Sequence, residues 1–254
     1  MERNYAHLFP LFLLNLLYHP VNTLSLQKTS DFRYNIRISS HTYMQSFLPS
    51  YDPLIPRKFS VGTIDQKIQN KTALQKSFGW PQEPKRPLLC LPAGMTDKLG
   101  GELFSALLPG LLTLPVEILV LGKGSTKYGA LFTKLSQEHG HRVRIMAEQE
   151  TDLHRMYAAS DMALFTDDPS DTEELTHCLR YGVVPVSSAA KTLSDYDPIQ
   201  ETGNAFIFAV PTKWHVFASL VRAMETYKFP FDWRTIQRHC METLPSRERN
   251  ISHG

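Results

Sequence analysis

The chain has 254 residues, 42% of them apolar, and a formal net charge of +2 with histidine neutral. This length allows one large or two modest domains with a sizeable buried core. Because the net charge is small, it gives no electrostatic reason to expect nucleic acid as a partner.

The three cysteines lie far apart in the sequence, and none belongs to a CxxC or a Cys/His metal-binding spacing. No metal site and no cofactor are therefore expected. Cys90 and Cys178 fall on a predicted strand and a predicted helix. They are interpreted as reduced core residues, which is typical of a cytoplasmic protein.

The first fifty residues are poorly patterned. Residues 8–18 form an apolar run that is too short to span a bilayer, so no membrane anchor is expected. The run could be the core of a signal peptide, although Arg3 is offset by Glu2 and no small-residue cleavage site follows. The alternative is a helix that packs on another part of the protein. A strand is expected at residues 32–40.

The next elements lead into the main domain. Residues 51–60 contain two prolines and predict an extended linker that lies on a surface. Residues 65–78 predict an amphipathic helix, which ends at the Gly-Trp-Pro sequence that follows. Residues 84–87 are a predicted hinge. The apolar stripe of the helix is expected to consist of Ile68, Ala73, Leu74 and Phe78.

Strand and helix patterns alternate from Arg86 to Ser188. Continuous apolar strands separated by helices indicate a parallel sheet that is buried on both faces. Ligands of such sheets bind beyond the carboxyl ends of the strands, so the functional residues are expected in the loops that follow each strand. The strands are predicted at residues 87–93, 116–124, 143–147, 161–165 and 183–188, and the helices at 101–112, 130–139, around 153–159, and before Gly182.

After residue 188 the alternation is lost. A polar loop at 189–204 precedes a last strand at 206–210, and helices are predicted at 214–227 and 233–244. Residues 245–254 are expected to be unstructured. The buried face of the first of these helices is predicted to contain Trp214, Phe217, Leu220, Val221 and Met224.

Several segments resemble the carboxyl-terminal domain of bacterial glycogen synthases and plant starch synthases, collinearly from about residue 38 to residue 241. The segments are NKTALQKSFGWP, ALLPGLL, ILVLGKG, LHRMYAASDMAL and LRYGVVPV. The resemblance implies one half of a GT-B glycosyltransferase, in which two Rossmann-like domains face one cleft. It implies a retaining enzyme of glycogen biosynthesis that moves glucose from ADP-glucose to an α-1,4-glucan.

The fold class that follows is a single Rossmann-like α/β domain with a parallel sheet, over residues 60–245. Residues 1–59 are interpreted as an N-terminal extension and linker, the remnant of the first domain, and residues 246–254 as a disordered tail. The resemblance implies ADP-glucose or a related nucleotide and an α-glucan as partners. A protein partner that covers the exposed cleft face is a further possibility.

The first loop, AGMTDKLGG, departs from the SRLTxQKG pattern of the family. Gly94 stands where the family has an arginine that neutralises the diphosphate, and Leu99 stands at the lysine position. Lys98 lies one position early. It is either a candidate ligand of the nucleotide sugar or a surface lysine.

The second loop, LGKGS, keeps its family form. Gly122 and Gly124 would let the backbone approach a nucleotide closely, with Lys123 near a phosphate. The alternative is a tight turn that needs glycine for its backbone angles.

The third and fourth loops depart further from the family. Glu148 occupies the position of the aromatic residue that stacks on adenine, while His154 matches the family and is either a nucleotide contact or a helix cap. Pro169 occupies the position of the sugar-binding glutamate. The acidic segment around Asp171 would bind a cation or a basic partner, or it is a solvated loop in which Asp171 or Thr172 caps the next helix.

Three functional hypotheses remain. The chain is a glycogen synthase-type glucosyltransferase, a non-catalytic relic that binds nucleotide, glucan or a partner protein, or a decayed product without a selected function. No catalytic residue is assigned, and no glucosyl transfer is expected from this chain alone.

Overall fold

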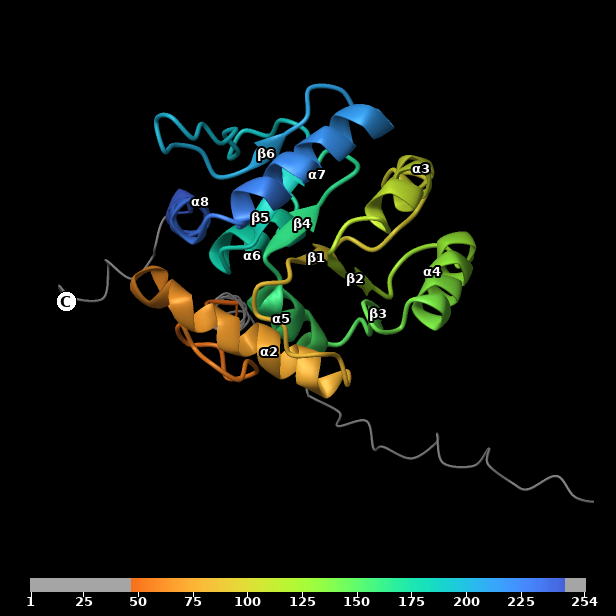
Figure 1. The fold of residues 1–254 in the computed structure, drawn as a ribbon, viewed down its shortest axis with the longest axis horizontal. Coiled ribbons are helices and arrows are strands. Elements are labelled where there is room, and N and C mark those ends of the chain that lie inside the picture. Colours follow the sequence, from red (N-terminus) through yellow and green to blue (C-terminus); the bar gives the residue numbers. More distant parts are fainter. Residues whose placement is uncertain (1–46, 245–254) are drawn as a thin grey trace, which may run out of the picture. The chain divides into compact units, whose positions relative to one another are not determined.

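Six parallel strands form a sheet in the described part of the chain, in the order β3-β2-β1-β4-β5-β6 (Figure 1). The computed structural model describes residues 47–244. The strands occupy the predicted positions, which confirms the α/β fold with a parallel sheet. Their bounds are β1 Leu88–Leu91, β2 Glu117–Leu121, β3 Val143–Met146, β4 Met162–Leu164, β5 Val184–Ser187 and β6 Phe206–Ile207.

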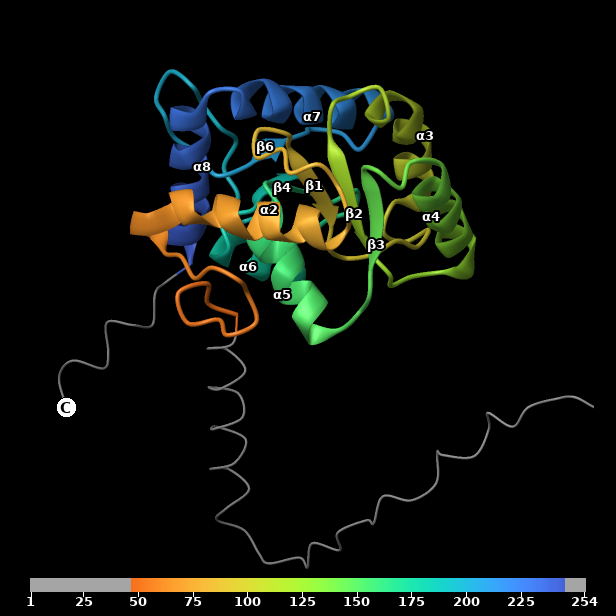
Figure 2. The ribbon, with the colours of Figure 1, turned by 60° about the horizontal axis from the view of Figure 1, so that its bottom comes forward.

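Helices cover both faces of the sheet. Figures 1 and 2 show α3, α4 and α7 on one side and α2, α5 and α6 on the other. With both faces covered, all residues of β1, β2, β4 and β5 are buried, as the continuous apolar runs predict. The helices are η1 Val61–Gln66, α2 Lys67–Ser77, α3 Gly101–Leu111, α4 Thr126–Glu138, α5 Glu150–Ala159, α6 Glu173–Arg180, α7 Lys213–Tyr227 and α8 Pro230–Thr243.

Helix α2 buries a polar face, which corrects the predicted apolar stripe. Ile68 is 46% exposed, whereas Lys67, Asn70, Lys71 and Gln75 are buried beside Leu74. Burying polar groups is unfavourable unless each one finds a hydrogen-bonding partner. The arrangement is therefore set by partners that lie elsewhere in the chain.

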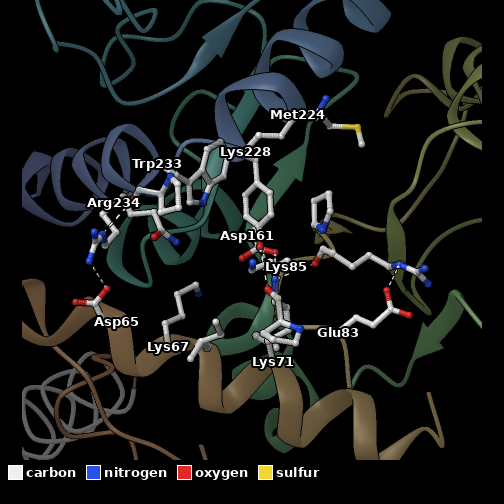
Figure 3. Close-up of a pocket in the computed structure, with 18 of the residues that line it drawn as sticks. Asp65, Lys67, Lys71, Glu83, Lys85, Asp161, Met224, Lys228, Trp233 and Arg234 are labelled. Atoms are coloured by element: carbon white, nitrogen blue, oxygen red, sulfur yellow. Dashed lines mark hydrogen bonds and ion pairs between the residues drawn. The ribbon is translucent and has the colours of Figure 1, made fainter. Parts of the chain in front are cut away.

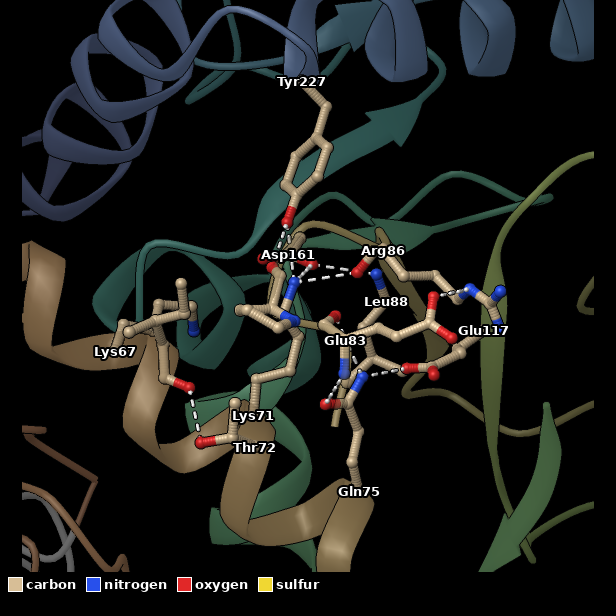
Figure 4. Close-up of polar contacts among 12 residues, drawn as sticks. Lys67, Lys71, Thr72, Gln75, Glu83, Arg86, Leu88, Glu117, Asp161 and Tyr227 are labelled. Atoms are coloured by element: carbon tan, nitrogen blue, oxygen red, sulfur yellow. Dashed lines mark hydrogen bonds and ion pairs between the residues drawn. The ribbon is translucent and has the colours of Figure 1, made fainter. Parts of the chain in front are cut away.

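The central partner is Asp161, at the residue before β4. Lys71 Nζ lies 2.6 Å from Asp161 Oδ2 and also donates to the carbonyl of Arg86 at 2.9 Å and to the hydroxyl of Tyr227 at 2.6 Å (Figure 4). The same carboxylate accepts from the backbone N–H of Leu88 at 2.8 Å. One ion pair thus connects α2 to the starts of β1 and β4 and to the end of α7.

Two further side chains of α2 reach buried partners. Lys67 Nζ donates to the carbonyls of Tyr157 and Ala158, at 2.8 and 3.1 Å, and so satisfies backbone acceptors at the end of α5. Gln75 Nε2 donates to Glu117 Oε2 at 2.8 Å, at the first residue of β2. Burial raises the pKa of Glu117.

The segment before η1 is not an extended surface linker as predicted. Asp52 is fully buried, accepts from the Tyr181 hydroxyl at 2.5 Å and lies 2.7 Å from His154 Nδ1. Phe47 packs on the His154 ring with the ring centroids 4.0 Å apart. The buried side chains of Phe47, Asp52, Ile55 and Phe59 therefore anchor this segment to the domain core.

Helix α7 also differs from its predicted face. Trp214 is 72% exposed, and Phe217 and Val221 are only partly buried. The prediction is wrong for Trp214 because the buried face lies further round the helix, on the side of Val216, Ser219 and Ala223. The fully and nearly fully buried residues of α7 are Val216, Ser219, Leu220, Ala223 and Met224.

All three cysteines are free and buried, and for Cys90 and Cys178 this confirms the predicted place in the core. The predictions for residues 8–18, 32–40 and 245–254 lie outside the described residues. Among residues 47–244, no helix has the length and apolar character needed to cross a bilayer.

Replacing Lys71 with Met is expected to lower the free energy of unfolding by about 3–5 kcal/mol, because it leaves the Asp161 carboxylate buried without its cation. Asp161→Asn should cost a similar amount. The double variant should lose clearly less than the sum of the two, since neither charge is then left unpaired. Urea denaturation of the four proteins measures this coupling, and simple additivity would contradict it.

Lys67 predicts a pH dependence of stability. Burial lowers the pKa of the Lys67 amine to about 7. The charges of Asp161, Cys90 and Cys178 act in the opposite direction and raise this pKa, whereas the charge of Lys71 lowers it further. Below pH 7 the lysine is charged in both states, and the folded protein carries the full cost of desolvation. Above pH 7 the folded state loses this proton while the unfolded state keeps it, so stability rises with pH.

The measurement compares wild-type protein with Lys67→Met by urea denaturation between about pH 6 and pH 9. The wild-type free energy of unfolding should increase relative to that of the variant as the pH rises above 7. Burial raises the pKa of the Cys178 and Cys240 thiols, which lowers stability at high pH. Comparison with the variant removes this contribution because both proteins contain the same cysteines. A difference that does not change with pH would contradict the assignment.

Candidate functional site

The chain changes direction across the sheet between β1 and β4, which are neighbours in space but not in sequence. Ligands of open parallel sheets bind at this point, beyond the carboxyl ends of the strands. Here the loops after β1 and β4 enclose a cavity of about 30 Å³. That volume holds no more than a water molecule or two. The lining residues are Ala93, Gly94, Met95, Leu99, Leu164, Phe165, Thr166, Asp167, Asp168, Pro169 and Thr172.

The loops after β1 and β2 are hydrogen-bonded to each other. The backbone N–H of Met95 donates to the carbonyl of Lys123 at 2.9 Å, and Ser125 N–H donates to the carbonyl of Met95 at 3.1 Å. A Cβ atom at Gly94 would collide with the Lys123 carbonyl, and one at Gly124 would collide with the Met95 carbonyl. Close packing between the two loops, rather than a ligand, requires these glycines.

Position 94 cannot hold the side chain that the family resemblance places there. Gly94 has φ +70°, and its missing Cβ leaves the space that Lys123 fills. The loop after β1 is also bonded to the loop after β4, because Thr166 Oγ1 donates to the Leu99 carbonyl at 2.6 Å. An arginine at position 94 would require a different path for the loop.

Lys123 lies beyond the carboxyl ends of the strands, which we call the carboxyl edge of the sheet, but it is placed between two carboxylates. Its Nζ is 3.5 Å from Glu148 Oε1 and 3.9 Å from Glu174 Oε1, and its side chain is 49% exposed. Gly122 and Gly124 on either side are exposed. The loop at 122–124 therefore reaches solvent with its lysine already near negative charge.

Lys127, in the first turn of α4, is paired in the same way. Its Nζ lies 2.8 Å from Asp97 Oδ1 and 3.9 Å from Glu102 Oε1. The hydrogen bond from Lys127 lowers the pKa of Asp97. The edge is acidic overall, because eight carboxylates and only three lysines (Lys98, Lys123 and Lys127) lie in these loops and helix starts. The carboxylates are those of Asp97, Glu102, Glu148, Asp167, Asp168, Asp171, Glu173 and Glu174.

Of the two other predicted site residues, Lys98 lies at the carboxyl edge with the second loop and His154 does not. Lys98 is exposed, and no carboxylate of residues 47–244 lies within ion-pair distance of its amine. His154 is fully buried and paired with Asp52, and it does not line the small cavity. The structure therefore brings Lys98 and residues 122–124 to the carboxyl edge and places the His154 side chain in the core.

The acidic loop after β4 is held by its own hydrogen bonds. Thr172 Oγ1 accepts from the Leu175 N–H at 3.3 Å and caps α6, so the predicted cap is threonine and not Asp171. Asp168 Oδ1 accepts from the N–H and the hydroxyl of Ser170, which lowers the pKa of Asp168. In the described chain, no group of three or more metal-ligating side chains is placed to hold an ion.

A larger cavity, of about 1000 Å³, lies at the opposite edge of the sheet (Figure 3). Its walls include Lys67 and Lys71 of α2 and Trp233 of α8. Reasoning from sequence missed it because the apolar pattern of α2 turns these lysines toward solvent. The only available signal was the family-like NKTALQ segment, which marks Lys71 without revealing its partner.

Comparisons with known proteins place the chain among glycosyltransferases. No family model matches the sequence. The chain is 30% identical over 210 residues to a glycogen synthase of Thermosipho melanesiensis, covering 80% of this chain and 44% of that protein. It is 31% identical over 211 residues to a glycogen synthase of Anaeromyxobacter dehalogenans, again covering 80% and 44%. The chain thus spans less than half the length of these relatives.

Two solved structures share the fold. One is the catalytic domain of starch synthase IV from Arabidopsis thaliana bound to ADP and acarbose, with TM-score 0.68 and 21% identity, covering 81% of this chain and 47% of that one. The other is the C-terminal domain of a group 1 glycosyl transferase from Francisella tularensis, with TM-score 0.50 and 9% identity, covering 69% and 91%. By sequence, the chain is similar to glycogen synthases over 80% of its length, and its fold is that of the carboxyl-terminal half of a GT-B glycosyltransferase.

Proposed function

We propose that this chain is a glycogen synthase-type donor domain that does not, by itself, transfer glucose from ADP-glucose to an α-glucan. The observation that carries the proposal is the state of the carboxyl edge. Its loops are hydrogen-bonded to one another around a cavity of about 30 Å³, and Lys123 and Lys127 are already paired with carboxylates. The buried free thiols favour a cytoplasmic location.

Transfer of a glucosyl unit leaves negative charge on the departing diphosphate. Fixed cations at that charge stabilise the transition state, and removing one such electrostatic contact costs about 2.7–4 kcal/mol of barrier. Here Gly94 and Leu99 replace the two cations of the family. Proline at position 169 has no side-chain acceptor for a sugar hydroxyl, and the carboxylates around it repel a diphosphate.

A non-catalytic binding role is the second candidate. It is favoured by the exposed loop at 122–124 and by the start of α4, where the Ser125 side chain makes no capping hydrogen bond. The N–H groups in the first turn of α4 are thus left for an anion. In this role the domain would hold a nucleotide weakly, and a glucan or a protein would be its other partner.

The purified chain is expected to incorporate no labelled glucose from ADP-glucose into glycogen. The relative from Thermosipho melanesiensis, assayed in parallel, serves as the positive control. Calorimetric titration with ADP should give a Kd of about 1 mM or weaker, because Lys123 is shared between two carboxylates. Measurable incorporation by the chain alone would overturn the proposal, and a Kd well below this value would favour the binding role.

Removing the carboxylates beside Lys123 should strengthen ADP binding. The double variant Glu148→Gln/Glu174→Gln frees the lysine, and we expect the Kd for ADP to fall about three- to tenfold at low salt. Glu138→Gln is the matched control, because Glu138 pairs with Lys134 at 3.8 Å and lines neither cavity. Equal affinities in the double variant and the wild-type protein would show that the second loop does not contact the phosphates.

A further inference from the structure

The cavity of about 1000 Å³ lies at the amino ends of the strands. Arg86 and Pro87 precede β1, Pro115 precedes β2 and Asp161 precedes β4, and all four line it. The carboxyl edge with the nucleotide-type loops is at the other end of the same strands. This cavity is therefore separate from the donor edge, and its use does not depend on the function proposed above.

Positive charge exceeds negative charge on the cavity wall. Three carboxylates line it, and each is already paired: Asp161 with Lys71 at 2.6 Å, Asp65 with Arg234 at 2.8 Å, and Glu83 with Arg86 at 3.0 Å. Two of these pairs, at either side of the cavity, are drawn in Figure 3. The lining cations are Lys67, Lys71, Lys85, Arg86, Lys228 and Arg234.

Two of these cations lack an acidic partner. Lys228 pairs with Glu225, outside the cavity, at 2.7 Å. For Lys67 and Lys85, no carboxylate of the described residues lies within ion-pair distance. Lys67 is only 4% exposed, so its charge is poorly solvated by water. An anion in the cavity would supply the missing negative charge.

Lys67 has a hydrogen-bonding donor to spare when it is charged. An ammonium group carries three N–H bonds, and the carbonyls of Tyr157 and Ala158 accept two of them. On the same wall, the Nε1 atom of Trp233 is buried and meets no acceptor within residues 47–244. Buried donors without acceptors are rare in folded proteins, and a bound ligand is one way to satisfy them.

Most of the other residues on the wall are apolar or aromatic, although Gln82 and Gln237 also line it. Ile64, Ile68, Met224 and the ring of Trp233 contribute to it, and Ile68 is 46% exposed at α2. Ligand sites of this size combine an apolar body with a few polar groups that orient the ligand. A bare inorganic ion would leave most of this wall unfilled.

We propose that this cavity is a binding site for a small organic oxyanion, a phosphate monoester or a carboxylate attached to an apolar or aromatic body. The anionic group is held by the unpaired cations Lys67 and Lys85. The apolar body packs against Ile68, Met224 and Trp233. The ligand is a small molecule because Lys67 and Trp233, each only 4% exposed, lie too deep in the cavity for the surface of a macromolecule to reach them.

Calorimetric titrations of the full chain with phenyl phosphate, benzoate and inorganic phosphate test the proposal. We expect phenyl phosphate or benzoate to bind with a Kd below about 1 mM, and inorganic phosphate at least tenfold more weakly, because it has no apolar body. The tighter of the two organic anions identifies the head group as phosphate or carboxylate. A Kd above about 10 mM for both would overturn the site.

Variants at exposed positions locate the binding without disturbing the fold. Lys85→Glu reverses one unpaired charge, and Ile68→Asp adds a negative charge to the wall. Each variant should raise the Kd of the preferred organic anion at least about threefold at low salt. Lys134→Glu is the matched control: it changes the net charge as Lys85→Glu does, but Lys134 is 72% exposed on α4 and lies outside the cavity.

Unchanged affinity in Lys134→Glu, together with loss in the other two variants, supports the site. Equal affinities in all four proteins, or equal losses in all three variants, overturn it, because binding would then be elsewhere or merely electrostatic. Lys67→Met is a further variant with a larger expected loss. Its unfolding is measured first, since Lys67 also bonds the end of α5.

Discussion

The buried ion pair between Lys71 and Asp161 organises this domain. It connects one helix to the starts of two strands and to the end of α7, through the Arg86 carbonyl, the Leu88 N–H and the Tyr227 hydroxyl. Burying two charges is costly, and the cost is offset because all three N–H bonds of Lys71 find acceptors and Asp161 Oδ2 accepts two hydrogen bonds. The pair therefore fixes how α2 sits against the sheet, and with it the cavity beside α2.

The carboxyl and amino ends of the parallel strands form two chemically different edges of the sheet, and in this protein the two edges differ in charge and in open space. The carboxyl edge, where open parallel sheets ordinarily bind their ligands, is narrow and acidic, and hydrogen bonds such as the one from Met95 N–H to the Lys123 carbonyl hold it closed. The amino edge is open over about 1000 Å³ and carries unpaired positive charge at Lys67 and Lys85. The space for a ligand is thus at the end of the sheet where the fold does not ordinarily place one.

The strands could be predicted from sequence because their burial depends on local pattern. A continuous run such as Glu117–Leu121 is buried on both faces in any parallel sheet of this kind, and its position was predicted correctly. Helix faces were predicted less well. Ile68 and Trp214 are apolar but exposed, while Lys67 and Lys71 are charged but buried. No pattern within a helix reveals this, because it depends on partners such as Asp161, which is 90 residues away.

The same division holds for the candidate site. Sequence alone determined the order of strands and helices and the relation to the glycogen synthases, and it predicts departures from the family pattern at Gly94, Glu148 and Pro169. Tertiary structure decided that glycine is required at position 94 by the Lys123 carbonyl and that Asp52 holds His154 in the core. The physical reason is that backbone periodicity is encoded locally, whereas the burial of a charge or the need for a glycine is settled by atoms that only folding brings together.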